Sequence, residues 1–583
     1  MFEVKILLVH CKSSIGNELS HPKLEHLGLG YLASVLRQHG YEVMILDAHL
    51  LGFSAKETVE KILQEEYGLI GFTIFSTNLE CTMQVISLLR SHGARTHIAL
   101  GGYFPTFLYK ELFTHYSGFD SIVRGEAEYA FLELAKKIEN SQDWRRIQNI
   151  AYLEDGKIIT NPMRPLIHDL DELPFPSRDT LPDLIKAGNP VISVSPSRGC
   201  YMNCSFCSII SFYGLSDGAK WRERSPENIV DEIELLLNSE IAKEHSIDYI
   251  WFAVDEFIGH KKNGKTHAQR IAEEILKRRL NFRFEIACRA DRVEEELFEP
   301  LFEAGLRSVY MGVESFVQNQ LDSFNKNCTV GDNERAIDIL EDLGIDYTLG
   351  TIVFSPETTF EEFKANQEAI RQIGYRHVTV PLARLKLFKG TSLEREMRQS
   401  EGSRGFSRQS YLSNRQLRYD LESLTESQFD KIYDYEFSDL QAAKLWEILS
   451  TCRESNEELV AAIIELHTNQ LIDGVTFWKL VFLVRDALAL YVDEAIGAVQ
   501  DDIDSQQVIE KHFERFQRSK KELRQFRTFL ESAEPETEIF YFTLNEQKIL
   551  YDNRTAQLPV IPGLEKEIAE KEYRKRGDIL TIG

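Results

Sequence analysis

The sequence predicts an α/β protein with a doubly wound N-terminal domain, a partial TIM barrel of six β/α units, and a helical C-terminal domain. Apolar strand patterns alternate with helical patterns over residues 4–138, and a second alternating series begins at Val191. Near residue 400 the strand alternation stops and long amphipathic segments follow. These changes place the domains at 1–140, 191–395 and 396–583, with a linker over 141–190.

In the N-terminal series, short apolar runs predict five strands, at 4–10, 41–47, 68–75, 97–102 and 119–125. Helical spacing predicts the intervening helices, at 27–40, 78–92 and 127–138. Alternation of this kind predicts a doubly wound parallel sheet that binds its ligand at the carboxyl ends of the strands.

Residues 141–190 differ in composition from both neighbours. DGKII (155–159) is typical of a hairpin fragment, and DLDELPFPSRD (169–179) is acidic and contains proline. This composition predicts a connector between two domains.

The second series predicts six strands, at 191–196, 249–255, 282–288, 308–313, 347–354 and 377–385. Helices are predicted between them, at 225–238, 268–279, 294–304, 334–343 and 359–373. The first of these helices begins with Ser225 as N-cap and Pro226 at the first helical position. Six such units predict a (β/α)6 partial barrel.

The C-terminal region predicts buried helices at 459–474 and 478–492 and an amphipathic helix with a solvated basic face at 511–531. No motif in this region indicates a function. We expect it to contribute to substrate binding.

The composition excludes several classes of protein. The chain has 583 residues and carries 67 Lys and Arg against 92 Asp and Glu, and the net charge of -25 disfavours a nucleic acid held by phosphate contacts. Its N-terminus has no basic region or cleavage site of a signal peptide. The most apolar later stretch, 477–492, is interrupted by charged residues. We therefore expect a cytoplasmic protein that does not interact with a membrane.

The cysteines form one cluster. Three of the eight, Cys200, Cys204 and Cys207, lie within SRGCYMNCSFCSI (197–209). No second cysteine pair follows at the spacing of a zinc site. Iron–sulfur clusters usually take four thiolates, so a triad would leave one iron open for a ligand. A chance cluster in a buried loop, or a zinc site completed by a distant histidine, are the alternatives.

The spacing Cys200-x3-Cys204-x2-Cys207, with Phe206 before the last cysteine, resembles the signature of the radical S-adenosylmethionine (SAM) superfamily. The resemblance implies that these three catalytic cysteines hold a [4Fe–4S] cluster. It also implies that the amino and carboxylate groups of SAM chelate the fourth iron, with Phe206 among the residues that contact SAM.

The same resemblance implies further SAM contacts where later strands end. Asp255 and Glu256 match the acidic motif that accepts hydrogen bonds from the SAM amino group, and Arg289 would meet its carboxylate. Glu314 and Ser315 occupy a position typical of ribose contacts. A surface salt bridge is the alternative role for each charged residue. The proposed adenine motif is Gly350-x-Ile352-x-Phe354-x-x-Glu357, in which Phe354 replaces the second glycine of the family pattern.

The N-terminal segments around HLGLGYLASVLRQHG, GLIGFTIFSTN, HIALGGYFPT and FDSIVRGEAE resemble the cobalamin-binding domain of B12-dependent radical SAM enzymes. The glycine pair would let the backbone approach the corrin closely. A Rossmann-like domain for another ligand, or for none, is the alternative. The implied cobalamin contacts are Ser76, Thr77, Asn78, Gly101, Gly102, Tyr103, Gly125 and Glu126.

Asp47 to Gly52 spell D-x-H-x-x-G, the motif whose histidine ligates cobalt in methionine synthase-like proteins. In those proteins the motif follows the first strand, but here it follows the second. We therefore expect His49 to be a loop residue and cobalamin to bind without a histidine ligand.

Together the resemblances imply a cobalamin-dependent radical SAM methyltransferase. Such an enzyme uses its cluster to cleave SAM reductively and methylcobalamin to methylate an unactivated centre of a small-molecule or peptide substrate. The expected electron donor is a protein such as flavodoxin or ferredoxin. Two alternatives stay open: an oxidative cyclase or rearrangement enzyme that does not transfer methyl groups, and a non-catalytic corrinoid or metal sensor.

Overall fold

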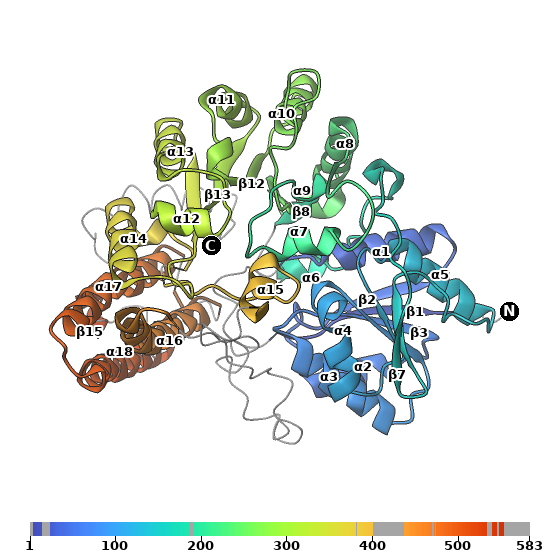
Figure 1. Ribbon diagram of the computed structural model, residues 1–583, viewed down its shortest axis with the longest axis horizontal. Helices are drawn as coiled ribbons and strands as arrows, with labels where there is room; N and C mark the ends of the chain where they lie inside the picture. The colour runs from blue at the N-terminus through green and yellow to red at the C-terminus, as the bar shows by residue number, and fades with distance from the viewer. Residues whose placement is uncertain are drawn as a thin grey trace.

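In the computed structural model of the protein, the chain forms three parts that pack against one another. The structure describes residues 4–13, 24–186, 191–380, 382–399, 437–468, 471–472, 474–532, 539–544 and 547–552. Figure 1 shows an N-terminal α/β domain, a ring of strand–helix units beside it, and a group of long helices beyond the ring. Predicted elements on other residues lie outside the described part of the chain.

The N-terminal domain is a seven-stranded sheet in the order β2-β1-β3-β4-β5-β6-β7. Its strands are β1 (Ile6–His10), β2 (Val43–Asp47), β3 (Leu69–Thr73), β4 (His97–Gly101), β5 (Ser121–Val123), β6 (Ile150–Glu154) and β7 (Lys157–Thr160). Its helices are α1 (Leu27–Gln38), α2 (Ala55–Ile62), α3 (Leu79–Ser91), α4 (Tyr103–His115) and α5 (Glu128–Glu139).

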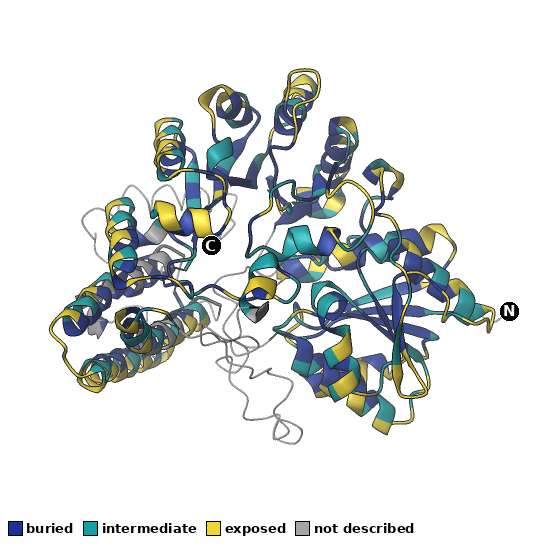
Figure 2. Ribbon diagram, in the orientation of Figure 1, coloured by how far each residue is buried: buried dark blue, intermediate teal, exposed yellow. Residues whose placement is uncertain are grey.

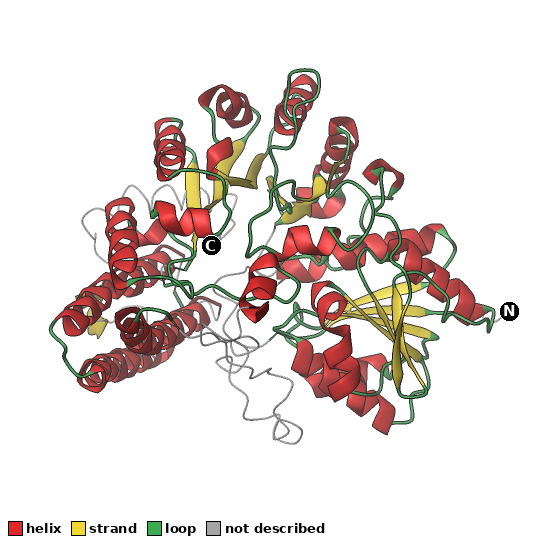
Figure 3. Ribbon diagram, viewed as in Figure 1, coloured by secondary structure: helices red, strands yellow, loops and turns green. Residues whose placement is uncertain are grey.

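This sheet has helices on both faces (Figure 3). Side chains of α1 and α5 pack in one apolar core, and those of α2, α3 and α4 pack in another on the opposite face. Strands β1 to β5 are parallel, as the sequence predicts. Because β2 and β3 lie on opposite sides of β1, the strand order reverses there, and doubly wound sheets bind their ligands at the carboxyl ends of the strands at such a point, here β1 and β3.

Two strands extend this sheet beyond the predicted domain. β6 pairs antiparallel with β5, and β7 pairs with β6 through the two-residue turn Asp155-Gly156. Both turn residues have positive φ angles, 49° and 75°, as a tight hairpin requires. Residues 150–160 of the predicted linker therefore belong to the N-terminal sheet. The connector continues with η1 (Leu170–Glu172) and α6 (Leu181–Lys186).

The barrel is a five-stranded parallel sheet in the order β14-β13-β12-β11-β8. Its strands are β8 (Ile192–Val194), β11 (Tyr249–Phe252), β12 (Arg283–Arg289), β13 (Leu306–Glu314) and β14 (Asp346–Thr351). The main outer helices are α8 (Pro226–Leu237), α10 (His267–Arg278), α11 (Glu295–Glu303), α13 (Val330–Asp342) and α14 (Phe360–Ile373). Shorter elements are β9 (Ser197–Gly199), α7 (Ser208–Tyr213), β10 (Trp221–Glu223), α9 (Glu240–Glu244), η2 (Ala290–Arg292), α12 (Gln318–Ser323) and η3 (Tyr375–His377).

The prediction of a sixth continuous barrel strand is wrong. Where the sequence predicts it, the described residues form two isolated parallel bridges, Leu349 with Val378 and Phe354 with Arg384. The segment between them contains Pro381, which has no N–H to donate to a strand ladder. The barrel is thus open beyond β14.

Long helices cover that open side. The C-terminal elements are α15 (Ser392–Gln399), α16 (Leu440–Thr468), α17 (Gly474–Gln500), α18 (Ser505–Ser532) and the hairpin β15 (Ile539–Leu544) and β16 (Gln547–Asp552). Apolar side chains of α16 and α17 belong to the same core as the barrel strands. Figure 2 shows the buried residues concentrated on the strands and on the inward faces of the helices. The hairpin is absent from the sequence prediction.

None of the helices in the described ranges is long and apolar enough to span a membrane.

Candidate functional site

The three cysteines lie in one loop between β9 and α7, after the first barrel strand. All three are free, Cys204 is buried, and Cys200 and Cys207 are half-buried. Cys207 is the N-cap residue of α7, and its N–H donates to the Cys204 carbonyl at 3.2 Å. The loop therefore holds the thiols in a compact turn at the carboxyl edge of the barrel sheet.

A two-stranded hairpin fixes the start of this loop. Gly199 pairs with Trp221 of β10 and has a φ angle of 83°, which favours glycine. A Cβ atom at this position would overlap the carbonyl oxygen of Lys220. The Gly199 N–H donates to Asp255 Oδ2 at 3.2 Å, which ties the cysteine loop to the segment after β11.

The loop after α12 contacts the cysteine loop from the other side. The Ser205 N–H donates to the Phe324 carbonyl at 2.8 Å, and Asn325 Nδ2 donates to the Asn203 carbonyl at 2.8 Å. Asn325 and Asn327 both have positive φ angles, 51° and 54°. Asparagine tolerates this conformation better than most residues, so these residues permit the sharp turns of the loop.

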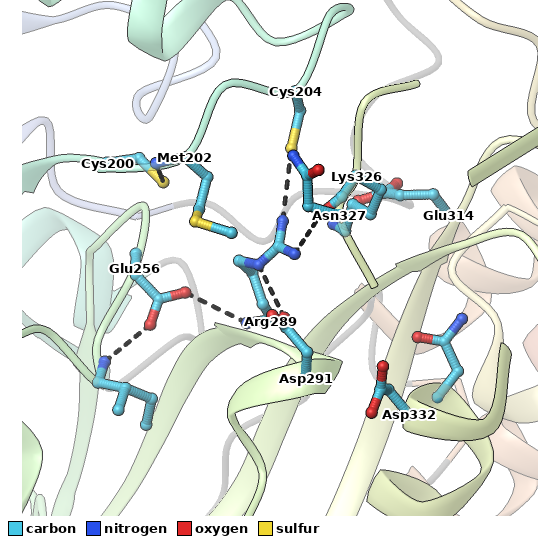
Figure 4. Close-up of polar contacts among 12 residues, drawn as sticks. Cys200, Met202, Cys204, Glu256, Arg289, Asp291, Glu314, Lys326, Asn327 and Asp332 are labelled. Carbon is cyan, nitrogen blue, oxygen red and sulfur yellow. Dashed lines mark hydrogen bonds and ion pairs between the residues drawn. The ribbon is translucent and has the colours of Figure 1, made fainter. Parts of the chain in front are cut away.

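Figure 4 shows Arg289, at the end of β12, between Cys204 and Asp291. Its Nη1 donates to Cys204 Sγ at 3.5 Å, and its Nε donates to Asp291 Oδ1 at 2.8 Å. The buried Lys326 lies beside it and pairs with Glu314 Oε1 at 2.7 Å. Two cations therefore lie next to one cysteine, where they can stabilise a thiolate or an anionic ligand.

Glu314 ends β13 with a φ angle of 65°, a strained conformation for a glutamate. The strand register shifts between Gly312 and Glu314, and the Glu314 carbonyl accepts the Ile352 N–H at 2.6 Å. This irregular end of β13 positions the Glu314 carboxylate for its ion pair with Lys326. Such outliers occur preferentially at functional sites.

The predicted acidic pair separates into two different environments. Asp255 is exposed, whereas Glu256 is fully buried and its burial raises the pKa of its carboxyl to about 7. The Glu256 oxygens accept the main-chain N–H groups of Ile258 at 3.0 Å and of Arg289 at 3.3 Å. The contacts of Glu256 therefore join the ends of β11 and β12.

Phe206 and Ile352 meet in one apolar cluster with Phe324, Leu385 and Leu387. The Phe206 and Phe324 rings lie edge to face at 5.5 Å. The structure thus brings together Phe206, a predicted SAM contact, and Ile352 of the predicted adenine motif, from distant parts of the sequence.

The cluster does not include Phe354 and Glu357 of the predicted adenine motif or Ser315 of the predicted ribose site. Phe354 is fully buried and stacks on Phe363 at 4.6 Å, with Trp446 of α16 at 5.1 Å. Its side chain thus fills the core between the barrel and the C-terminal helices. Glu357 is exposed in the turn before α14. The buried Ser315 hydroxyl lies 2.6 Å from Gln320 Oε1 and 3.0 Å from Asn366 Oδ1, and it accepts the Val317 N–H.

In the N-terminal domain, the predicted cobalamin contacts after β3 form a closed turn. Asn78 is buried, accepts the Phe75 N–H at 2.9 Å and donates to the Thr73 carbonyl at 3.1 Å. Ser76 is half-buried, and Thr77 Oγ1 donates to Ser13 Oγ at 3.3 Å. Asn78 therefore shapes the turn, whereas Ser76 and Thr77 lie on its outer part.

The predicted glycines allow close approach at the ends of β4 and β5. Gly102 follows Gly101 with a φ angle of 103°, and a Cβ atom there would lie 3.1 Å from the Ile74 carbonyl oxygen. Gly125 has a φ angle of 72°, and its N–H donates to Thr106 Oγ1 at 3.0 Å. Side chains larger than hydrogen would obstruct both loops.

Tyr103 and Glu126 contact the barrel domain. The Tyr103 ring lies 4.1 Å from the ring of Phe212 on α7, directly after the cysteine loop. Glu126 pairs with Arg198 of β9 at 3.1 Å and with Arg222 of β10 at 2.9 Å. The carboxyl ends of the two parallel sheets therefore meet beside the cysteine loop.

The thiols fit an iron–sulfur cluster. Burial raises the pKa of Cys200 to about 12 and also raises the pKa of Cys207, so these thiols ionise at neutral pH only with a strong positive partner. In the described ranges, no three His, Cys, Asp or Glu side chains converge tightly enough to bind a single metal ion.

Comparison with family models matches residues 19–135 to the B12 binding domain and residues 194–370 to the radical SAM superfamily. The fold and the two sheet edges thus define a radical SAM protein with a B12-binding domain. The chain belongs to the cobalamin-dependent radical SAM enzymes. These matches confirm the predicted cofactor set of [4Fe–4S] cluster, SAM and cobalamin at the level of the domains.

Similar proteins carry different activities in their names. An uncharacterized methyltransferase of Pyrococcus horikoshii is 29% identical over 359 residues, which cover 61% of this chain and 75% of that protein. An anaerobic magnesium-protoporphyrin IX monomethyl ester cyclase of Rubrivivax gelatinosus is 30% identical over 382 residues, covering 62% of this chain and 65% of that one. The structure of the cobalamin-dependent S-adenosylmethionine radical enzyme OxsB with aqua-cobalamin bound aligns with a TM-score of 0.71 and 21% identity over 91% of this chain and 81% of that one, which confirms the predicted fold class.

Sequence reasoning missed Lys326, Asp291 and His10. Lys326 lies in a polar loop with no strand pattern, and its approach to Cys204 depends on the turns at Asn325 and Asn327. His10 ends the first predicted strand, a position that could have indicated a ligand-facing residue.

Proposed function

We propose that this protein is a cobalamin-dependent radical SAM methyltransferase acting on a small-molecule or peptide substrate. The proposal rests on one observation: the carboxyl ends of the two sheets meet. Tyr103 packs against Phe212 of α7, and Glu126 forms an ion pair with Arg198. When bound, the cluster supplies the electron that cleaves SAM, and the corrinoid supplies a methyl group. A substrate held between the two edges can reach both.

The barrel residues divide into ligand-facing and structural groups. We assign Cys200, Cys204 and Cys207 to the cluster, and Asp255 to the amino group of SAM. The SAM carboxylate falls to the Arg289 and Lys326 cations, and adenine to the apolar cluster of Phe206 and Ile352. The contacts of Glu256 and Ser315 favour structural roles, because main-chain and side-chain groups of the protein already bind them.

The N-terminal residues divide in the same way. Ser76, Thr77, Gly101, Gly102 and Gly125 surround the edge where we place cobalamin. Asn78, Tyr103 and Glu126 shape that edge or hold it against the barrel. Helices α16 and α17 pack against the open side of the barrel, and we propose that they form part of the substrate cavity.

The similarity to a cyclase supports a second candidate, an oxidative cyclisation without methyl transfer. Mass spectrometry separates the two, because methylation adds a methyl group to the product and cyclisation does not. Anaerobic reconstitution with iron, sulfide and cobalamin, followed by reduced flavodoxin and SAM, is expected to yield 5'-deoxyadenosine.

The matched variants are Cys204→Ser, in the cysteine loop, and Cys81→Ser, in α3 of the other domain. Cys204→Ser should lose the cluster absorbance and 5'-deoxyadenosine formation, and Cys81→Ser should keep both. Cleavage of SAM by Cys204→Ser at the wild-type rate would refute the enzyme assignment.

A further inference from the structure

Three histidines gather at the carboxyl edge of the N-terminal sheet. The His10 ring centroid lies 5.2 Å from that of His26 and 5.3 Å from that of His49. The exposed Phe75 lies 6.0 Å from His10. His10 is the last residue of β1, and its strand partners are Asp47 and Thr73. The cluster thus lies at the carboxyl ends of β1 and β3, where the strand order reverses.

The hydrogen bonds of each ring determine which nitrogen keeps a lone pair. His26 Nδ1 accepts the Leu29 N–H at 3.2 Å, so its proton is on Nε2, which lies 3.2 Å from Thr73 Oγ1. His49 Nδ1 accepts the Ser13 N–H at 3.3 Å, so its Nε2 also carries the proton. In these tautomers neither ring offers a lone pair on Nε2.

His10 has the opposite tautomer. Its Nδ1 lies 3.1 Å from Asp47 Oδ1, a carboxylate oxygen that can only accept, so Nδ1 carries the proton and Nε2 keeps its lone pair. Asp47 is buried, so its carboxylate is held in place beside the His10 ring. The Leu50 N–H fixes the same carboxylate oxygen at 2.9 Å.

A histidine held through Nδ1 by a carboxylate is the usual arrangement of a metal ligand and its supporting acid. No third ligand converges here among the described residues, so the cluster does not suit a bare metal ion. A corrin brings four equatorial nitrogens with its cobalt, and such a metal needs a single ligand from the protein. The exposed Phe75 offers the apolar contact that a corrin face would cover.

We infer that His10 Nε2, oriented by Asp47, is the axial ligand of the corrinoid cobalt on the side of the sheet. His49 of the D-x-H-x-x-G segment is not the ligand. This inference rests on the proposed cobalamin site. It assigns the ligand to the end of the first strand and to a residue outside the sequence motif.

The test is electron paramagnetic resonance of the full-length protein loaded with cob(II)inamide. This corrinoid lacks the nucleotide tail, so any axial nitrogen comes from the protein. The wild type should show a nitrogen triplet on the cobalt lines, and protein labelled with ¹⁵N-histidine should show a doublet. His10→Ala should lose the splitting, and His26→Ala and His49→Ala should keep it.

Several results would overturn the assignment. Bound corrinoid without nitrogen splitting would do so, and so would splitting that survives His10→Ala or disappears in His49→Ala or His26→Ala. The last two variants keep the test decisive if His10→Ala does not fold. A spectrum without splitting alongside observed methyl transfer refutes only the ligand, whereas failure to retain corrinoid refutes the proposed cobalamin site as well.

Discussion

Glu126 offers a quantitative test of how the two sheet edges are held together. Its Oε1 lies 2.9 Å from Arg222 Nη2 and 3.1 Å from Arg198 Nη1, and its Oε2 accepts the Ile167 N–H at 2.9 Å. The side chains of Glu126 and Arg222 are only 8% and 4% exposed. Burial alone would raise the pKa of Glu126, but the two arginines hold it below its ordinary value.

Replacing Glu126 with alanine leaves Arg222 buried with the Ile167 carbonyl as its remaining acceptor. Removing one partner of a buried ion pair costs about 3–5 kcal/mol. Because Arg198 keeps its second partner, Glu128, at 2.7 Å, we expect the lower end, about 3 kcal/mol. The matched control is Glu42→Ala, whose pair with Lys5 is about half exposed, so its loss should leave the free energy of unfolding close to that of the wild type.

The assay is urea unfolding of the apo full-length protein followed by circular dichroism, with the first transition compared between variants. A Glu126→Ala protein as stable as the Glu42→Ala control would refute the structural role. If the Glu126→Ala protein were that stable but bound cobalamin more weakly, Glu126 would instead be a direct cobalamin contact.

Three further predictions concern the barrel. Gly199→Ala should prevent cluster assembly, because its Cβ would overlap the Lys220 carbonyl at a φ angle of 83°, whereas Gly497→Ala in α17 meets no atom within 4 Å and should assemble the cluster normally by absorbance. Phe354→Ala should lower the free energy of unfolding by about 3–5 kcal/mol, since its fully buried ring packs against Phe363 and Trp446; unchanged stability would contradict its placement in the core. Glu256→Gln should flatten the pH dependence of apo-protein stability: burial raises the folded-state pKa from 4.5 to about 7, so the contribution is present below pH 4.5 and lost as the pH rises through 7, and identical wild-type and variant profiles over that range would refute it.

The fold was predictable wherever local pattern and tertiary structure agree. The first five strands of the N-terminal sheet and five barrel strands follow from short apolar runs. The pairing of β6 with β5 required long-range contacts that periodicity does not encode, although Asp155-Gly156 signals the hairpin itself. The apolar run that predicts the sixth barrel strand contains Pro381, which has no N–H for a strand ladder, and the described residues around it form two isolated bridges.

The candidate site was predictable in its chemistry and less so in its contacts. The spacing of Cys200, Cys204 and Cys207 specifies a thiolate site, and this information is local. Whether Glu126 faces a ligand or an arginine depends on how two domains pack. The cation pair of Arg289 and Lys326 likewise forms only when the loop after α12 folds against the cysteine loop.

The measurement that tests the central claim most directly uses SAM with a deuterated methyl group. The reconstituted enzyme is incubated anaerobically with reduced flavodoxin and a mixture of small molecules and peptides, and all products are identified by mass spectrometry. The proposed function predicts a product that carries the labelled methyl group, with 5'-deoxyadenosine and S-adenosylhomocysteine formed in equal amounts. Formation of 5'-deoxyadenosine and a cyclised or oxidised product without the label would contradict methyl transfer.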